Sequence, residues 1–289
     1  MPTPLAGDPT WLGDLALNVI DDQGVEWVVT ANDGWAGSPD STQQVTQRQA
    51  DHGGYPSASY LAPRQLPLAV TIHAPSKTLR EQAVETLKAA ATLAATTLRV
   101  QQDSYDRTAT VYRQAATLAT AYGNTADVSV SLIAPDPRLY ATAGYSASCQ
   151  LPSITGGLTF PVTFPAVFSA TVSSGSIPVG NLGNIGSRPL LRITGPCVTP
   201  LVTLQRPDGS VQQLTYNGTL GALDFLDLDC DRHTAILDGT ASRRGLLTVT
   251  GGWPEIPPGA TPDACALDFN AASTTGAPTL TASWTDAWE

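Results

Sequence analysis

Basic residues are scarce in this chain, and lysine is nearly missing. Lys77 and Lys88 are the only lysines, and 25 Asp and Glu outnumber 15 Lys and Arg, which gives a formal net charge of -10. Contact with nucleic-acid phosphates needs a basic stripe, so this charge balance excludes a nucleic-acid binder. It also leaves no polybasic segment for attachment to an anionic membrane.

Long hydrophobic runs are missing as well. No apolar stretch approaches the roughly 20 residues that a membrane-spanning helix needs, so we expect no membrane partner. The N-terminal Met1-Pro2-Thr3-Pro4 does not begin a signal peptide, and we expect synthesis and folding in a cytoplasm. A hydrophobic content of 42% is nevertheless enough for a buried core, and 289 residues suit two domains of ordinary size.

Motifs for catalysis and cofactors are also lacking. His52-Gly53-Gly54 resembles an esterase oxyanion loop, but Gly144-Tyr145-Ser146-Ala147-Ser148 lacks the last glycine of a GxSxG elbow. The glycines of Gly180–Gly186 precede no helix, as a dinucleotide loop would require. The three histidines, His52, His73 and His233, show no metal spacing. We therefore predict a protein that is not an enzyme and binds no cofactor.

Four cysteines are present but form no CxxC pair. This spacing supports neither a zinc site nor a redox motif. Buried free thiols are the expected state, and a single disulfide is the alternative. The residues are Cys149, Cys197, Cys230 and Cys265.

The densest acidic cluster lies at residues 224–231. Asp227-x-Asp229-x-Asp231 resembles the opening of a calcium loop, but the sixth place holds Arg232 rather than glycine. On a strand these three carboxylates would share one face, opposite Leu226, Leu228 and Cys230. We favour a solvated strand face, with a calcium site as the alternative.

The stretch Ala134-Pro135-Asp136-Pro137-Arg138-Leu139-Tyr140 divides the chain. Its two prolines remove two backbone donors, so neither a helix nor a central strand can continue through it. An alternating strand pattern, Asp127–Ile133, precedes it, and a Gly-, Ser-, Thr- and Pro-rich sequence without helical periodicity follows. We predict two domains, 1–140 and 141–289.

The first half is predicted to be α+β. A hairpin, Leu15–Ile20 with Val25–Val29, turns at Gly24, and one helix begins at a capping box of Thr78 and Glu81. Its apolar stripe contains Leu79, Ala83, Leu87, Ala91 and Ala94. Further strands are expected at Leu66–Ala74, Leu98–Gln101, Thr108–Tyr112, before Gly123-Asn124, and at Asp127–Ile133.

Between the hairpin and the strand at Leu66 lies a segment without periodicity, Ala31–Pro63. A structureless loop of about thirty residues is uncommon in a compact domain and usually has a function. We interpret it as an arm that becomes ordered against another molecule, such as a neighbouring copy.

The second half is predicted to be entirely β. Short strands at regular spacing, separated by turns such as Pro207-Asp208-Gly209-Ser210 and Asp238-Gly239, indicate a sandwich or jelly roll. The proline-interrupted segment Thr159–Ala170 is typical of an edge or irregular strand. Trp253, Trp284 and Trp288 favour core or interface packing, with a sugar-stacking platform as the alternative.

The order of these features resembles the distal tail (minor tail) proteins of long-tailed, siphovirus-type bacteriophages. The matching pieces of the first half are the N-terminal hairpin, the polar arm, the single helix and the Ala134–Tyr140 stretch, with Arg48, His52, Tyr60 and Arg64 along the arm. In the second half they are Asn181-Leu182-Gly183-Asn184, Pro189, Ile193-Thr194-Gly195-Pro196, Asp227-Leu228-Asp229, Asp238-Gly239, Trp253 and Pro258-Gly259.

This resemblance implies a structural virion protein at the phage tail tip. The first domain would form a ring, commonly a hexamer, with Arg48, His52, Tyr60 and Arg64 of the arm reaching a neighbouring subunit. The second domain would be a galectin-like β-sandwich. The implied partners are the tail tube protein, tail tip or hub proteins, and fibre or receptor-binding proteins, while genome DNA passes through the lumen without specific binding. The alternative is a carbohydrate-binding tail module that contacts host cell-wall glycans through Trp253 and Trp288.

Overall fold

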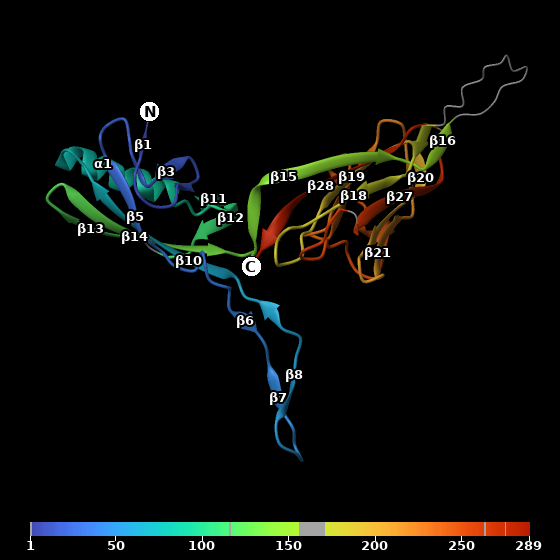
Figure 1. Cartoon of the computed structure of the whole chain (residues 1–289), viewed down its shortest axis with the longest axis horizontal. Coiled ribbons are helices and arrows are strands. Elements are labelled where there is room, and N and C mark those ends of the chain that lie inside the picture. The colour runs from blue at the N-terminus through green and yellow to red at the C-terminus, as the bar shows by residue number, and fades with distance from the viewer. Residues whose placement is uncertain (1, 116, 156–170, 263, 275) are drawn as a thin grey trace, which may run out of the picture. The chain divides into compact units, whose positions relative to one another are not determined.

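The computed structural model describes residues 2–115, 117–155, 171–262, 264–274 and 276–289. The predicted strand in Thr159–Ala170 lies outside these residues. The chain forms two compact units, one of Met1–Thr142 with Glu289 and one of Ala143–Trp288. Both consist mainly of antiparallel strands, which confirms the mainly β prediction, and the first carries α1 (Figure 1).

The first unit is organised around two long strands. β10 (Arg64–His73) and β14 (Thr125–Ala134) pair over their whole length, from Arg64 opposite Ala134 to His73 opposite Thr125. Their side chains alternate between buried and exposed, as expected for a sheet with one covered face. On the β10 side the sheet continues through β5 (Glu26–Asn32), β4 (Val19–Ile20) and β1 (Thr3–Pro4).

The other edge of β14 pairs with β13 (Leu118–Tyr122) and with the end of β12 (Asp106–Arg113). From β12 the pairing continues to β11 (Thr96–Gln101), β2 (Thr10–Leu12) and β3 (Leu15–Leu17). The predicted strand pairs around Gly24, Asp103–Asp106 and Gly123 are thus confirmed. The first predicted strand is interrupted at Asn18, which has a φ of 57°.

Helix α1 spans Lys77–Ala90, and its predicted cap is wrong. Ser76, not Thr78, is the N-cap: it is extended (φ -144°, ψ 161°), and its hydroxyl accepts a 3.3 Å hydrogen bond from the Leu79 amide. Thr78 and Glu81 both lie inside the helix, so the expected capping box does not form. Ser76 and Thr78 both carry a hydroxyl that can cap a helix, so the local sequence does not distinguish them. Which of the two becomes the N-cap depends on where the chain turns from β10 into the helix.

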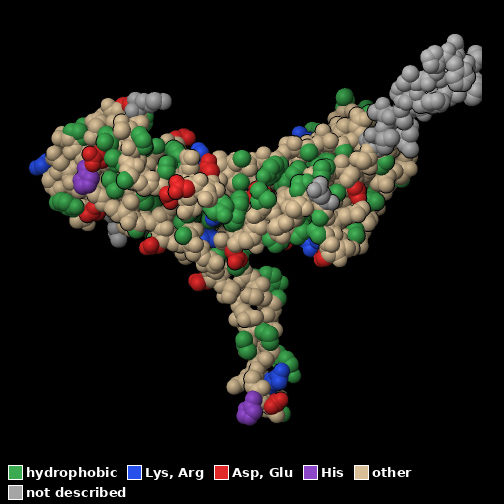
Figure 2. All heavy atoms as spheres, in the orientation of Figure 1, with side chains coloured by type: hydrophobic (Ala, Val, Ile, Leu, Met, Phe, Trp, Pro, Cys, Tyr) green, Lys and Arg blue, Asp and Glu red, His purple; other side chains and the backbone are tan. Residues whose placement is uncertain are grey.

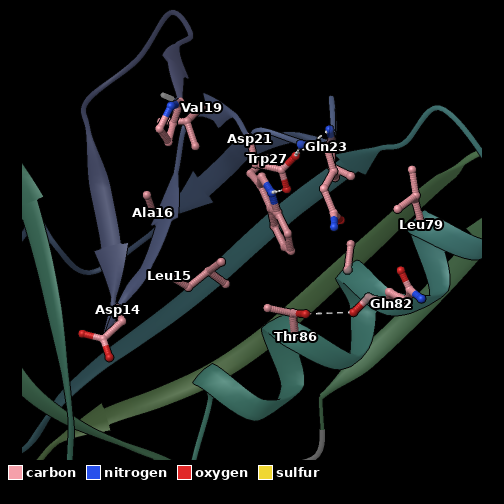
Figure 3. A pocket seen from close by; sticks show the side chains of 13 residues that line it. Asp14, Leu15, Ala16, Val19, Asp21, Gln23, Trp27, Leu79, Gln82 and Thr86 are labelled. Carbon is pink, nitrogen blue, oxygen red and sulfur yellow. Dashed lines mark hydrogen bonds between the residues drawn. The ribbon is translucent and has the colours of Figure 1, made fainter.

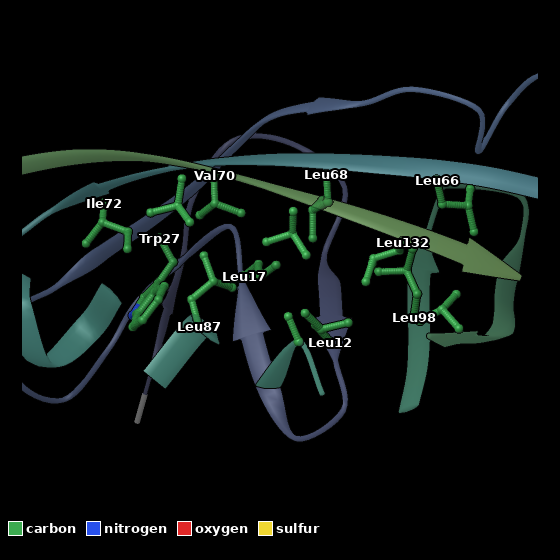
Figure 4. Packing of buried hydrophobic residues seen from close by; sticks show 14 of the residues in the cluster. Leu12, Leu17, Trp27, Leu66, Leu68, Val70, Ile72, Leu87, Leu98 and Leu132 are labelled. Atoms are coloured by element: carbon green, nitrogen blue, oxygen red, sulfur yellow. The ribbon is translucent and has the colours of Figure 1, made fainter. Parts of the chain in front are cut away.

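The core of the first unit lies between this helix and the sheet. Ala83, Val84 and Leu87 are the buried residues of α1. Figure 4 shows Leu87 and Leu17 facing the inward side chains of the long strands, including Leu68, Val70 and Ile72. Ala91 is already the C-cap and Ala94 lies beyond the helix, which therefore ends earlier than its apolar stripe suggests.

Strand β15 (Leu139–Gln150) begins in the first unit, where Tyr140 and Ala141 pair with β12, and continues into the second. In the second unit, one sheet contains the rest of β15, β28 (Thr279–Trp288), β19 (Leu190–Thr194), β23 (Phe225–Asp229), β24 (Thr234–Leu237) and β25 (Ala241–Ser242). The other contains β18 (Ser176–Pro178), β27 (Ala266–Ser273), β20 (Cys197–Gln205), β21 (Val211–Tyr216), β26 (Leu247–Thr250) and β22 (Thr219–Leu220). Both contribute to one hydrophobic core, with Leu228 and Ile193 from the first and Leu204 and Phe269 from the second. The described residues of this unit also include the pair β16 (Ser153–Thr155) with β17 (Thr171–Ser173) and a 3-10 turn at Arg244–Leu246.

Two carboxylates of the acidic cluster, Asp227 and Asp229, lie on β23 with the alternation expected of a strand, whereas Asp231 follows the strand. Leu226 and Leu228 are buried, while Asp227 forms a two-fold contact with Arg192 at 2.6 and 2.8 Å. Asp231 pairs with Arg188 at 3.0 Å. No group of His, Cys, Asp and Glu within the described part of the chain is arranged to hold a metal ion.

All four cysteines are free, so the disulfide alternative does not occur. Burial raises the pKa of the Cys149 and Cys197 thiols to about 11. The described residues also include no helix with the length and apolarity needed to cross a bilayer.

Candidate functional site: the arm and its base

The segment predicted as a loop is a β-hairpin. β6 (Ser41–Thr42) pairs with β9 (Tyr60–Leu61), and β7 (Val45–Gln47) pairs with β8 (Gly54–Pro56), as Figure 1 shows. A hydrogen bond from the Ala62 amide to the Asp40 carbonyl closes its open end at 2.7 Å. The prediction of a structureless segment is therefore wrong. Two strands can pair through backbone hydrogen bonds even when their side chains show no apolar periodicity. The segment has no such periodicity, so its strands could not be predicted from the sequence pattern.

The hairpin, Asp40–Ala62, is called the arm below, and it has almost no buried surface. Every residue from Asp40 to Tyr60 except Gly54 is exposed. Val45, Tyr55 and Tyr60 expose 65%, 63% and 70% of their surface, and apolar side chains occur along the arm in Figure 2. An isolated two-stranded hairpin is at best marginally stable in water. The exposed apolar groups on the arm therefore indicate that it binds to the surface of another molecule.

Arg48 and His52 lie near the tip of the arm, in and beside the turn that joins β7 to β8. The Arg48 guanidinium lies 4.8 Å from the centre of the Tyr55 ring and 3.6 Å from a carboxylate oxygen of Asp51. His52 is exposed, and its backbone amide donates to Asp51 at 2.7 Å. These contacts are local and leave the side chains accessible to another molecule.

Arg64 differs from the other arm residues singled out from the sequence. It is the first residue of β10, and only 1% of its surface is exposed. Its guanidinium donates to the carbonyls of Gly34 at 2.7 Å, Gly37 at 2.5 Å and Pro137 at 2.9 Å. Burial lowers the pKa of Arg64, because desolvation disfavours the charged form. Arg64 therefore serves the base of the arm and offers no exposed surface to a neighbour.

The base of the arm is connected through Arg64 to the proline-flanked stretch that divides the sequence. Asp136 accepts hydrogen bonds from the Arg138 amide at 3.2 Å and from the Tyr140 hydroxyl at 2.5 Å. The adjoining Pro137 carbonyl is the one that Arg64 binds. Arg64 and Pro137 are 73 residues apart, so no local pattern could have indicated this contact.

A cavity of about 380 Å³ lies between α1 and the N-terminal strands (Figure 3). Trp27, Leu15, Val19 and Leu79 supply much of its wall. Its carboxylate Asp21 already accepts hydrogen bonds from the Gln23 and Val25 amides and from the Trp27 indole. These contacts fix the hairpin turn at Gly24, so Asp21 is a structural group, and Asp14 is the other carboxylate of the lining.

Of the tryptophans considered for sugar stacking, Trp284 and Trp288 lie on β28 and Trp253 lies in a loop. Trp253 follows β26 and is half-buried; the His233 ring stacks on it with centroids 5.0 Å apart and planes 16° apart. Trp288 is the half-buried last residue of β28. Trp284 is buried, and its indole donates to the Gly180 carbonyl at 2.8 Å.

Comparisons with known proteins identify the fold. No family model and no curated protein matches the sequence. Among solved structures, the SPP1 Dit protein, described as a paradigm of the hub adsorption apparatus in phages that infect Gram-positive bacteria, matches with a TM-score of 0.59 and 13% identity. The match covers 98% of this chain and 100% of that chain, so the two proteins share a fold along their whole length.

Two structures of the phage P2 baseplate in its activated conformation also match this chain. The structure with Ca has a TM-score of 0.45 and 10% identity, and covers 96% of this chain and 97% of that chain. The structure with Sr has a TM-score of 0.43 and 10% identity, and covers 96% and 98%. At these TM-scores the two baseplate structures carry no argument, and the fold assignment is taken from the match to the SPP1 protein.

Proposed function

We propose that this chain is a structural protein of a phage tail, located in the virion at the tail tip and without catalytic activity. Its role would be that of a distal tail adaptor, which forms an oligomeric ring, commonly a hexamer, and joins the tail tube to the adsorption apparatus. The fold shared with the SPP1 hub protein supports this role. The observation that carries it is the exposed arm, a hairpin with apolar side chains and no core of its own.

The partners follow from this role. The arm of one copy would cover a neighbouring copy in a closed ring, because a surface that repeats in every subunit is fully used only when the ring closes. The tail tube protein would bind one side of the ring, and tip, fibre or receptor-binding proteins the other. A net charge of -10 suits a lumen through which genome DNA passes, since like charges repel.

Replacing Ser41–Leu61 by a short Gly-Ser linker tests the arm. This boundary keeps Gly34, Gly37 and the buried Trp35, which a deletion of the whole predicted arm would remove. We expect the shortened protein to fold with an unchanged unfolding midpoint but to remain a monomer, alone and with the tail tube protein. Light scattering and negative-stain images would measure assembly, and a ring formed without the arm would contradict the proposal.

A matched pair of point variants refines the same test. Val45→Ser changes an apolar side chain of the arm that is 65% exposed, and Val211→Ser changes one on β21 that is 47% exposed. Only the first should weaken assembly. Equal effects of the two variants would show that general surface polarity, rather than the arm, controls association.

We also propose that residues 1–140 and 141–289 fold separately and have different tasks. The second would be a galectin-like domain that decorates the ring. Expressed alone, each piece should unfold cooperatively, and only the first should oligomerise. A second piece that forms the oligomer by itself would overturn this division.

Carbohydrate binding by the second domain is the alternative function. Trp253 and Trp288 both keep part of their surface exposed, although the His233 ring and the Arg244 guanidinium already contact the Trp253 indole. A glycan array with the intact protein, Trp253→Ala and Trp288→Ala tests it. Binding that disappears in either variant supports this function, and an array without hits removes it.

A further inference from the structure

A small cavity in the second unit has an unusual lining. Its volume is about 160 Å³. Strands β15 and β28 and the loops after β18 and β26 form its wall. The lining residues are Tyr145, Gly180, Asn181, Leu182, Ala260, Pro262, Trp284 and Asp286, and none of them is basic.

Asp286 places a carboxylate in this otherwise largely apolar wall. Only 5% of its surface is exposed. One oxygen accepts from the Leu182 amide at 2.8 Å, and the other accepts from the Tyr145 hydroxyl at 3.0 Å. Both donors are neutral, and no lysine, arginine or histidine among the described residues forms an ion pair with it. A buried carboxylate with only neutral partners is incompletely compensated, which favours a bound cation.

Two aromatic rings stand beside this carboxylate. Tyr145 and Trp284 stack with centroids 5.5 Å apart and planes 25° apart. The hydroxyl contact to Asp286 and the indole contact to the Gly180 carbonyl fix both rings. Tyr145 is 44% exposed, so the pocket is reachable from solvent. Aromatic rings attract cations through the negative potential of their faces.

The loop that closes the pocket is held rigidly. Asn181 is fully buried, and its side-chain oxygen accepts from the Gly183 amide at 3.0 Å and from the Ala287 amide at 3.1 Å. A Cβ on Gly183 would lie 1.7 Å from the Ala287 carbonyl oxygen, so only glycine permits this approach. The pocket is therefore formed before any ligand binds, as small-molecule sites usually are.

The hydrogen-bonding capacity of the wall indicates which cation fits. A primary ammonium carries three donors, and each needs an acceptor when it is buried. The Gly180 carbonyl already accepts from Trp284, and the Ala260 carbonyl accepts from the Asn181 amide. Each of these carbonyls therefore has one lone pair left for a further donor. Leu182, Ala260 and Pro262 add apolar surface. A quaternary ammonium has charge and methyl groups but no donors, so it needs no further acceptor from this wall.

We propose that this cavity, the Asp286 pocket, binds a quaternary ammonium group such as the head of choline. The Asp286 carboxylate supplies the opposite charge, the Tyr145 and Trp284 rings supply cation–π contact, and Leu182 packs on the methyl groups. The proposal does not depend on ring assembly. It gives the second unit a ligand of defined chemistry, distinct from a sugar stacked on Trp253 or Trp288.

Calorimetric titration of the full chain at constant ionic strength tests the ligand class. The probes are tetramethylammonium chloride and choline chloride, with methylammonium chloride and sodium chloride as controls. Saturable binding of the two quaternary ions is expected, at least tenfold tighter than methylammonium, which corresponds to about 1.4 kcal/mol. No saturable binding, or methylammonium binding that is equally tight, would overturn the proposal.

Three variants test the assigned residues. Asp286→Asn keeps the side-chain shape and removes the charge, so affinity for tetramethylammonium should fall at least tenfold. Tyr145→Leu should also weaken binding at least tenfold, and its exposed position makes it informative if Asp286→Asn does not fold. Asp208→Asn, which changes an exposed carboxylate in the β20–β21 turn, should bind as the parent does. Unchanged affinity in both folded pocket variants would show that the site lies elsewhere.

Discussion

The arm and the paired strands β10 and β14 have the same antiparallel backbone pairing but differ in how many of their side chains are buried. β10 and β14 pair over ten residues, and alternate side chains enter the core. In the arm, the paired segments are two or three residues long, and nearly every side chain is exposed. Backbone pairing alone gives little net stability, whereas apolar burial supplies most of the driving force. The sheet is therefore self-sufficient, and the arm depends on a surface outside its own chain.

Replacing Arg64 should lower the free energy of unfolding the most, because this residue of β10 holds the base of the arm. Arg64→Met removes the guanidinium that donates hydrogen bonds to three carbonyls but keeps an apolar side chain. We expect a loss of about 3 kcal/mol in the free energy of unfolding. Denaturant unfolding measures it, with Arg48→Met at the arm tip as the control without a measurable change. Similar values for both arginines would show that the contacts at the arm base contribute nothing.

Two equal truncations compare the regions directly. Val130→Ala in β14 removes two fully buried methyl groups and should cost about 2 kcal/mol. Val45→Ala in the arm changes a side chain that is 65% exposed and should leave the isolated chain's stability unaltered. Both are measured by denaturant unfolding of the unassembled protein. A comparable cost at Val45 would mean that the arm packs within its own chain after all.

A smaller difference is expected at the start of α1, which covers the sheet. Ser76→Ala removes the observed cap hydrogen bond and should cost about 1 kcal/mol, the typical loss for an N-cap. Thr78→Ala, already inside the helix, should change stability by less. Thermal unfolding of the two variants gives the order, and the reverse order would restore the capping box that the sequence suggested.

The smallest effect is expected for a surface ion pair of the first unit. Arg99 binds both oxygens of Asp106 at 2.8 and 2.7 Å, and this contact lowers the pKa of Asp106. The lowered pKa means that the pair stabilises the fold above the unfolded-state pKa of about 3.9 and that this contribution is lost as pH falls further.

Because both side chains are about one-third exposed, water screens the Arg99–Asp106 pair. Asp106→Asn should therefore cost about 0.5 kcal/mol at pH 7 and nothing at pH 2. The arm pair Arg48–Asp51, at 3.6 Å, should show no such effect in Asp51→Asn. Urea unfolding at the two pH values measures both, and a cost in Asp106→Asn that persists at pH 2 would exclude the ion pair as its source.

The sequence alone determined features that depend on a few neighbouring residues. The alternation in Asp127–Ile133 predicts β14, Pro135 and Pro137 mark its end, and the apolar spacing around Leu87 predicts the single helix. Burial on one face follows directly from a period of two or 3.6 residues, so these elements could be predicted.

Only the tertiary structure decided which distant groups meet. The sequence placed Arg64 with the arm residues, but in the structure it donates a hydrogen bond to the carbonyl of Pro137, 73 residues away. Asp286 and Tyr145, 141 residues apart, carry no shared sequence signal for the pocket that they line. The strand pairing in the arm could not be predicted from the sequence either, because backbone hydrogen bonds do not depend on side-chain periodicity. Local patterns specify which face of an element is buried, whereas the partner of a polar group depends on the path of the whole chain.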